Sequence, residues 1–372
     1  MNPTYLKSNL LIGLKSKKNQ LLIILLVLFI IFSLFIVEKQ KIGDGAKSWE
    51  NYGQSLQANA NYFDSEMLKR PTYKSTYNNL NKQSQELASL QNSQVFVDPV
   101  QYLTSYRNLL NTMQAGYHNH HYAGAKTLNV PSQFFIRQEL NKTDYLIKHK
   151  IPVVMNNESS ATYLIYILSV LGTIIFFYLS FISSDSWIIN LRHQSILKNI
   201  PYRFKDEVFG KIIINSTLVF LPLLLGMILA YIFAGLRHGF VTLNYPVIFY
   251  STSILAIPLW LYCFLFLVYL SGLIIFVTSL SLFLNQLTKN VYLTIFIEVI
   301  PYALLFLPKS ALKWLVFLPF PYLNLTDLLN GNLANKLNLN SINLLTGYCV
   351  LLIWSIFLLI LFKYLSAGRK KQ

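Results

Sequence analysis

The chain has 372 residues, of which 54% are hydrophobic and only 12% are charged, and its mean hydropathy is +0.43. A soluble globular protein carries roughly 25% charged residues, so the composition favours a polytopic membrane protein. The formal net charge of +16 comes mainly from residues beside apolar runs, not from one basic stripe, which argues against a nucleic-acid-binding protein.

Residues 1–37 predict a membrane helix that follows a basic tail. The apolar run from Leu21 to Val37 is about the shortest that crosses ~30 Å of hydrocarbon. No small-residue cleavage site follows Val37, so we interpret the run as an uncleaved helix with its N-terminus in the cytoplasm. The tail before it holds no acid and four lysines, Lys7, Lys15, Lys17 and Lys18.

Residues 38–160 predict an extracytoplasmic domain, because they are rich in Asn, Gln, Ser and Tyr and contain no apolar run of membrane length. Apolar side chains recur at helical spacing, so we expect helices packed side by side with these stripes as the core. The stripes are Trp49, Tyr52, Leu56 and Phe63, and Leu103, Tyr106, Leu110, Met113 and Tyr117. The three histidines of 117–122 have no carboxylate or cysteine beside them, so we interpret this tract as a polar loop and predict no metal.

Residues 161–372 contain the remaining apolar runs, which are 161–183, 212–236, 247–284, 291–307 and 344–365. The uncharged run 247–284 is about 57 Å long as a straight helix, so we predict one tilted or kinked helix with a bend near Pro258, entered through an interfacial stretch. Segment 308–343 is broken by Pro319 and Pro321, and we predict that it is re-entrant or interfacial. The fold class is therefore an all-α polytopic membrane protein with six spans.

The polar segment 184–211, between two of these runs, is predicted to lie in the cytoplasm. It contains five basic and three acidic residues, and short basic loops stay on the cytoplasmic side. The same rule places both termini in the cytoplasm. The charged residues are Arg192, Lys198, Arg203, Lys205 and Lys211 against Asp185, Asp206 and Glu207.

An apolar helix, a proline and a short basic stretch follow one another in 195–203, and Phe209-Gly210-Lys211 then opens the next run. This order resembles the segment between the second and third helices of the type-2 ATP-binding-cassette (ABC) export permeases, over about 30 residues in motif and over the whole chain in topology. The resemblance implies a coupling helix, 191–200, that docks on an ATPase. The alternative is a solvated basic loop whose only role is to fix the orientation of the neighbouring helices in the membrane. The implied contact residues are Leu191, Arg192, His193, Gln194, Ser195, Ile196, Leu197, Lys198, Pro201 and Arg203.

The chain has no GxxxxGK[ST] loop, so we expect ATP to be bound by a separate cytoplasmic ATPase subunit and no cofactor to be bound here. Other expected partners are a second copy or a related permease, and membrane lipid. The resemblance implies export of a peptide or another amphipathic or hydrophobic substrate, and by analogy a Gram-positive cell membrane. The alternative is a membrane-anchored peptide sensor or immunity protein that uses the domain 38–160.

Glu298 is the one acid deep within a predicted span. An unpaired carboxylate is costly there, so we expect it to face the bundle interior, a partner subunit or a water-filled path that it lines. A packing acid beside Pro301 is the alternative. With neither HExxH nor GxSxG in the sequence, an intramembrane enzyme lacks its usual residues, and we predict no catalytic site.

Overall fold

The computed structural model describes residues 3–43, 45–125, 127–154, 157–192 and 204–368. Most of these residues are helical, which confirms the prediction of a mainly α-helical polytopic membrane protein. In these ranges 5 helices are long and apolar enough to cross a membrane. They are α2 (Lys17–Gln40), α7 (Ser160–Ser183), α10 (Phe204–His238), α11 (Leu259–Thr288) and α16 (Leu344–Gly368).

These helices form a bundle in which α11 occupies the centre. It packs against α16, α7, α10 and the shorter apolar helix α12 (Val291–Ala303), which continues into a 3-10 turn, Leu304–Phe306. The contact between α11 and α16 depends on glycine, because a Cβ on Gly272 would lie 2.7 Å from the ring of Tyr348. Helix α10 runs without interruption through Pro222.

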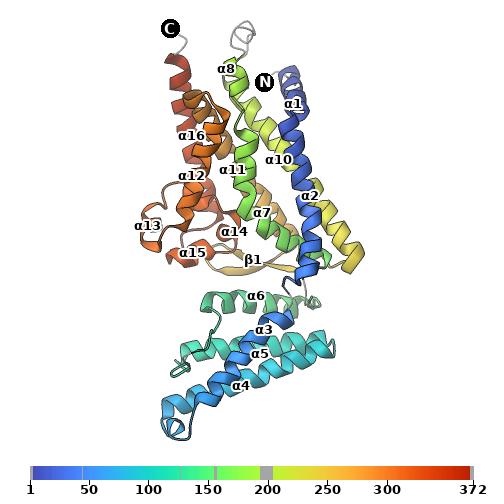
Figure 1. Cartoon of the computed structure of the whole chain (residues 1–372), viewed down its shortest axis with the longest axis vertical. Helices are drawn as coiled ribbons and strands as arrows, with labels where there is room; N and C mark the ends of the chain where they lie inside the picture. The colour runs from blue at the N-terminus through green and yellow to red at the C-terminus, as the bar shows by residue number, and fades with distance from the viewer. Residues whose placement is uncertain (1–2, 44, 126, 155–156, 193–203, 369–372) are drawn as a thin grey trace.

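Both termini lie at one end of the bundle, which we call the terminal end (Figure 1). A helical domain, residues 45–151, lies beyond the opposite end, which we call the domain end. It consists of α3 (Gly45–Tyr62), a 3-10 turn (Met67–Lys69), α4 (Pro71–Val95), α5 (Pro99–His118) and α6 (Gln133–His149).

The first apolar stripe predicted for this domain and most of the second form its core, but Leu103 belongs to the core cluster of the bundle and Tyr117 is only partly buried. Trp49, Tyr52, Leu56 and Phe63 are all buried in one cluster with Leu110 and neighbouring residues of α5. Helix starts are fixed by local capping, since Asp98 accepts hydrogen bonds from the backbone N–H groups of the first turn of α5. Helix α6 is the part of the domain that contacts the bundle end. Its Gln138 amide donates a hydrogen bond to the Asn330 carbonyl oxygen at 2.8 Å.

The prediction of a single helix over 247–284 is wrong for its first part. A two-stranded antiparallel sheet occupies that part, with β1 (Pro246–Tyr250) paired to β2 (Ile254–Pro258). Aromatic and β-branched residues favour strands, and the fixed φ and missing N–H of Pro258 suit the residue just before the helix, so α11 begins at Leu259. At about 1.5 Å per residue, α11 alone is long enough to cross a bilayer.

Segment 308–343 is broken into short elements at the domain end. None is long enough to cross a membrane, and one of them is wedged against the bundle: Thr326 donates to the Ser169 carbonyl oxygen of α7 at 2.6 Å. The elements are α13 (Lys309–Trp314), a 3-10 turn (Phe320–Tyr322), α14 (Leu325–Leu329) and α15 (Asn332–Leu337).

Candidate functional site

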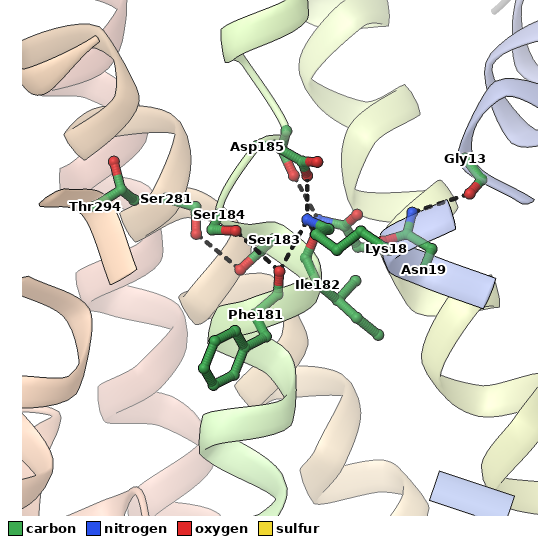
Figure 2. Close-up of polar contacts among 12 residues, drawn as sticks. Gly13, Lys18, Asn19, Phe181, Ile182, Ser183, Ser184, Asp185, Ser281 and Thr294 are labelled. Atoms are coloured by element: carbon green, nitrogen blue, oxygen red, sulfur yellow. Dashed lines mark hydrogen bonds and ion pairs between the residues drawn. The ribbon is translucent and has the colours of Figure 1, made fainter. Parts of the chain in front are cut away.

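Polar side chains gather at the terminal end, where α2, α7, α10, α11 and α12 meet (Figure 2). Such groups are rare in an apolar bundle, because each must find a hydrogen-bond partner to offset its lost hydration. We call this set the polar cluster; its members are Lys18, Ser183, Asp185, Ser186, Asn215, Thr278, Ser281, Asn285, Thr294 and Glu298.

Lys18 joins the start of α2 to the end of α7. Its ammonium group lies 2.6 Å from Asp185 Oδ1 and donates to the carbonyl oxygens of Phe181, at 2.9 Å, and Ile182, at 3.3 Å (Figure 2). The last carbonyls of a helix have no helical partner, and a cation at that end is favoured by the helix dipole. Lys18 therefore caps α7 and holds Asp185, the first charged residue of segment 184–211.

The short helix α1 (Pro3–Lys15) lies next to the start of α2 at the terminal end. It packs along α10, and the Asn19 amide of α2 donates to the Gly13 carbonyl oxygen at 2.9 Å. Gly13 itself lies against Ile214 and Leu218 of α10. The break between α1 and α2 at Ser16 is thus fixed by contacts with neighbouring helices.

Glu298 is fully buried and faces the bundle interior. Its Oε1 accepts a hydrogen bond from Ser281 of α11, whose hydroxyl oxygen is also 2.7 Å from that of Ser183 in α7. Its other oxygen, Oε2, has no hydrogen-bond partner among the described residues. The Ser281 hydroxyl therefore links α7, α11 and α12.

Asn215 connects α10 to the chain beyond α7. Its buried amide donates to Ser186 Oγ at 3.0 Å and to Thr278 Oγ1 of α11 at 3.1 Å. One turn earlier on the same helix, Lys211 is also buried. Asn215 therefore ties the start of segment 184–211 to α10 and α11.

An apolar cluster lies beside these polar contacts. The Trp187 ring centroid is 5.0 Å from that of Phe362 in α16, and the Phe204 centroid is 5.3 Å from the same ring. The cluster, which we call the aromatic clamp, also includes Leu282 of α11 and Leu191. The residues on either side of 193–203 thus pack on one surface made by α11 and α16.

Two of the predicted ATPase contacts fall within the described ranges. Leu191 and Arg192 end the short helix α8 (Ile188–Arg192), where Leu191 packs in the aromatic clamp and Arg192 is exposed. Helix α10 begins at Phe204, earlier than the run from 212 suggested. The other eight, His193, Gln194, Ser195, Ile196, Leu197, Lys198, Pro201 and Arg203, lie outside the described residues.

Sequence reasoning missed the residues that anchor this segment. Trp187 and Phe204 flank the basic stretch, and serines at 183 and 281 interrupt apolar runs near their ends, so weak signals were present. Phe362 and Lys18 carried no such signal, because their partners are distant in the chain.

The described part of the chain contains no group of three or more His, Cys, Asp or Glu side chains that could hold a metal ion. Comparison with protein-family models, with curated proteins and with solved structures gave no match. Function must therefore be inferred from the geometry of the terminal end.

Proposed function

We propose that this chain is the transmembrane permease subunit of an ABC exporter and not itself an enzyme. It would move a peptide or another amphipathic or hydrophobic substrate out of the cell, driven by a separate cytoplasmic ATPase. In this proposal α12 is the sixth crossing, the terminal end is cytoplasmic, and the helical domain lies outside. The common end of both termini and the lysines at that end support this orientation (Figure 1).

The observation that carries the proposal is the attachment of segment 184–211 to the helices. On one side Asp185 is bound to Lys18, and on both sides of 193–203 the aromatic clamp packs on Phe362. A loop that only sets topology needs no such anchorage. An ATPase docked on 193–203 would push on α2, α7, α10, α11 and α16 together, because packed side chains transmit displacement.

Exposed apolar faces of the bundle fit lipid and a partner permease. Helices α10 and α16 present rows of large aliphatic side chains that water would leave unfavourably exposed. Pairing with a second copy or with a related permease would place a substrate path between two bundles. The exposed rows include Leu221, Leu225, Ile228 and Ile232 of α10, and Ile353, Ile356 and Ile360 of α16.

The test is a pull-down of the detergent-solubilised chain co-expressed with ABC ATPase subunits of the same cell, beginning with any encoded beside it. One variant replaces 193–203 by an uncharged Gly/Ser stretch of equal length. The matched control neutralises Lys309 and Lys313 at the domain end.

We expect the ATPase to co-purify with the wild type and the control, and to be lost with the replaced segment at unchanged yield. If the replaced segment keeps the ATPase, or none binds to the wild type, segment 184–211 only sets topology. The sensor or immunity reading then takes first place.

A further inference from the structure

A polar groove of about 650 Å³ lies between α4 and α5 of the helical domain, which run alongside each other (Figure 1). This volume is within the usual range of ligand sites, roughly 300–1,000 Å³. None of the described residues that line the groove is Phe, Tyr or Trp. Amide and charged side chains dominate instead, among them Asn78, Asn79, Lys82, Glu86, Asn108 and Asn111.

The two walls of the groove face each other in a fixed register. Ser89 of α4 and Ser105 of α5 approach to 2.8 Å between their hydroxyl oxygens, and the helices are antiparallel. Glu86 is therefore placed opposite Asn108. Asn78, Lys82 and Glu86 follow one another at steps of four residues, so they lie on one face of α4.

The groove offers hydrogen-bonding groups that the domain itself does not use. Among the described residues, the side-chain amides of Asn78, Asn108 and Asn111 form no hydrogen bond, whereas the Asn79 amide donates to the His121 carbonyl oxygen at 3.2 Å. Lys82 and Glu86 likewise form no ion pair within the described ranges. The groove thus presents donors and acceptors on both walls, and two opposite charges side by side on the α4 wall.

We propose that this groove binds a short, extended peptide segment. An asparagine amide carries both a donor and an acceptor, as a peptide group does, so facing asparagines can engage the main chain of a strand laid between them. From Ser75 to Glu86 the wall is about 16 Å long at ~1.5 Å per residue, which matches about five extended residues at ~3.3 Å each.

The charges define the preferred side chains. Lys82 and Glu86 are one helical turn apart, about 5–6 Å. Alternate residues of a strand point the same way and are roughly 6.6 Å apart, so an acid and a base separated by one residue match the two charges. Sugars usually stack on aromatic rings, which this lining lacks, and the same charges are poorly suited to a neutral glycan.

The test uses the purified full-length chain in detergent and the fluorescently labelled peptide Ser-Asp-Ser-Lys-Ser, with both ends blocked. Fluorescence anisotropy is expected to show binding at least tenfold tighter than that of blocked penta-serine. Lys82→Glu should weaken this peptide at least tenfold and should now favour Ser-Lys-Ser-Lys-Ser. Lys74→Glu is the matched control, because Lys74 is exposed on the same helix outside the groove, and it should change neither preference.

Asn111→Leu supplies a second check at an exposed position, and it should weaken both charged peptides equally. Three results would overturn the proposal: no binding at millimolar peptide, equal effects of Lys82→Glu and Lys74→Glu, or binding of chitotriose in preference to peptide. Helices α4 and α5, between which the groove lies, are far from the terminal end (Figure 1), so peptide binding and ATPase docking can fail independently.

Discussion

The ammonium group of Lys18 lies 2.6 Å from the carboxylate of Asp185, so the first turn of α2 holds the residue at which the chain leaves α7. About a third of each side chain is exposed, and pairs with this exposure contribute little stability alone, roughly 0–1 kcal/mol. The two carbonyl oxygens that Lys18 also binds add a helix cap. The main effect of the contact is therefore to fix the position of Asp185 relative to α2, and its effect on stability is small.

Lys18→Met should remove both the ion pair and the cap while keeping the length of the side chain. We expect a loss of about 1–2 kcal/mol of stability and a clear drop in recovery of the ATPase. Thermal unfolding in detergent and the pull-down measure the two effects. Lys17→Met is the matched control, because Lys17 is exposed and has no ion pair among the described residues.

A charge exchange separates the two contributions of Lys18. The double variant Lys18→Asp/Asp185→Lys can restore an ion pair, but it places a carboxylate beside the α7 carbonyls. We expect only partial recovery of stability for this reason. Full recovery would show that the cap contributes nothing.

The aromatic clamp predicts a second set of effects. Phe362 is fully buried, and Phe362→Ala should cost about 3–5 kcal/mol and free the end of α8. In inverted membrane vesicles, trypsin should then cleave after Arg192 several-fold faster. Phe357→Ala changes an exposed ring of the same helix and should leave the cleavage rate unchanged. Equal rates for both variants would contradict the clamp.

The helical stripes and most membrane helices could be predicted because they depend on local periodicity. Leu56 and Leu110 recur at helical spacing with other apolar residues, and the structure buries both. Most of the long apolar runs form helices, in which the backbone polar groups are satisfied within the segment, as a membrane requires.

The features that could not be predicted from the sequence depend on contacts between residues that are far apart in the chain. Hydropathy alone does not distinguish the strands β1 and β2 from the start of α11, because both are uncharged and apolar. The partners Lys18 and Asp185 are far apart in sequence, as are Trp187 and Phe362. No periodicity in the sequence links such pairs. The contacts that anchor segment 184–211 are therefore visible only in the folded structure.

Glu298 supplies a third prediction through its bond with Ser281. Glu298→Gln keeps the shape and an acceptor oxygen, and it should cost less than about 1 kcal/mol. Glu298→Leu should cost about 2–3 kcal/mol, because it removes a buried acceptor and changes shape. Adding Ser281→Ala to Glu298→Leu should cost less than the sum of the single changes. If the losses of stability in the two single variants add up to the loss in the double variant, the hydrogen bond between Ser281 and Glu298 does not contribute to stability.

The tyrosines of the helical domain predict sensitivity to alkali. Burial raises the pKa of Tyr102 and of Tyr122 to about 12, from an ordinary value near 10. The folded domain keeps these protons while the unfolded chain loses them, so stability is complete below pH 10 and falls as the pH rises toward 12. Phenolate absorbance and helix content should change together in this window. Tyr102→Phe should lower the number of protons released on unfolding near pH 11 by about one. An unchanged number would contradict a raised pKa for Tyr102.

The orientation of the chain gives the last prediction, tested by cysteine labelling after Cys263 and Cys349 are replaced by alanine. Gln101→Cys on α5, Lys313→Cys on α13 and Lys205→Cys at the start of α10 are exposed positions. A membrane-impermeant maleimide should label the first two in intact cells, and the third only after the membrane is opened, because the proposed orientation places the basic terminal end in the cytoplasm. Labelling of Lys205→Cys in intact cells would put segment 184–211 outside, out of reach of any cytoplasmic ATPase, and the exporter proposal would fail with it.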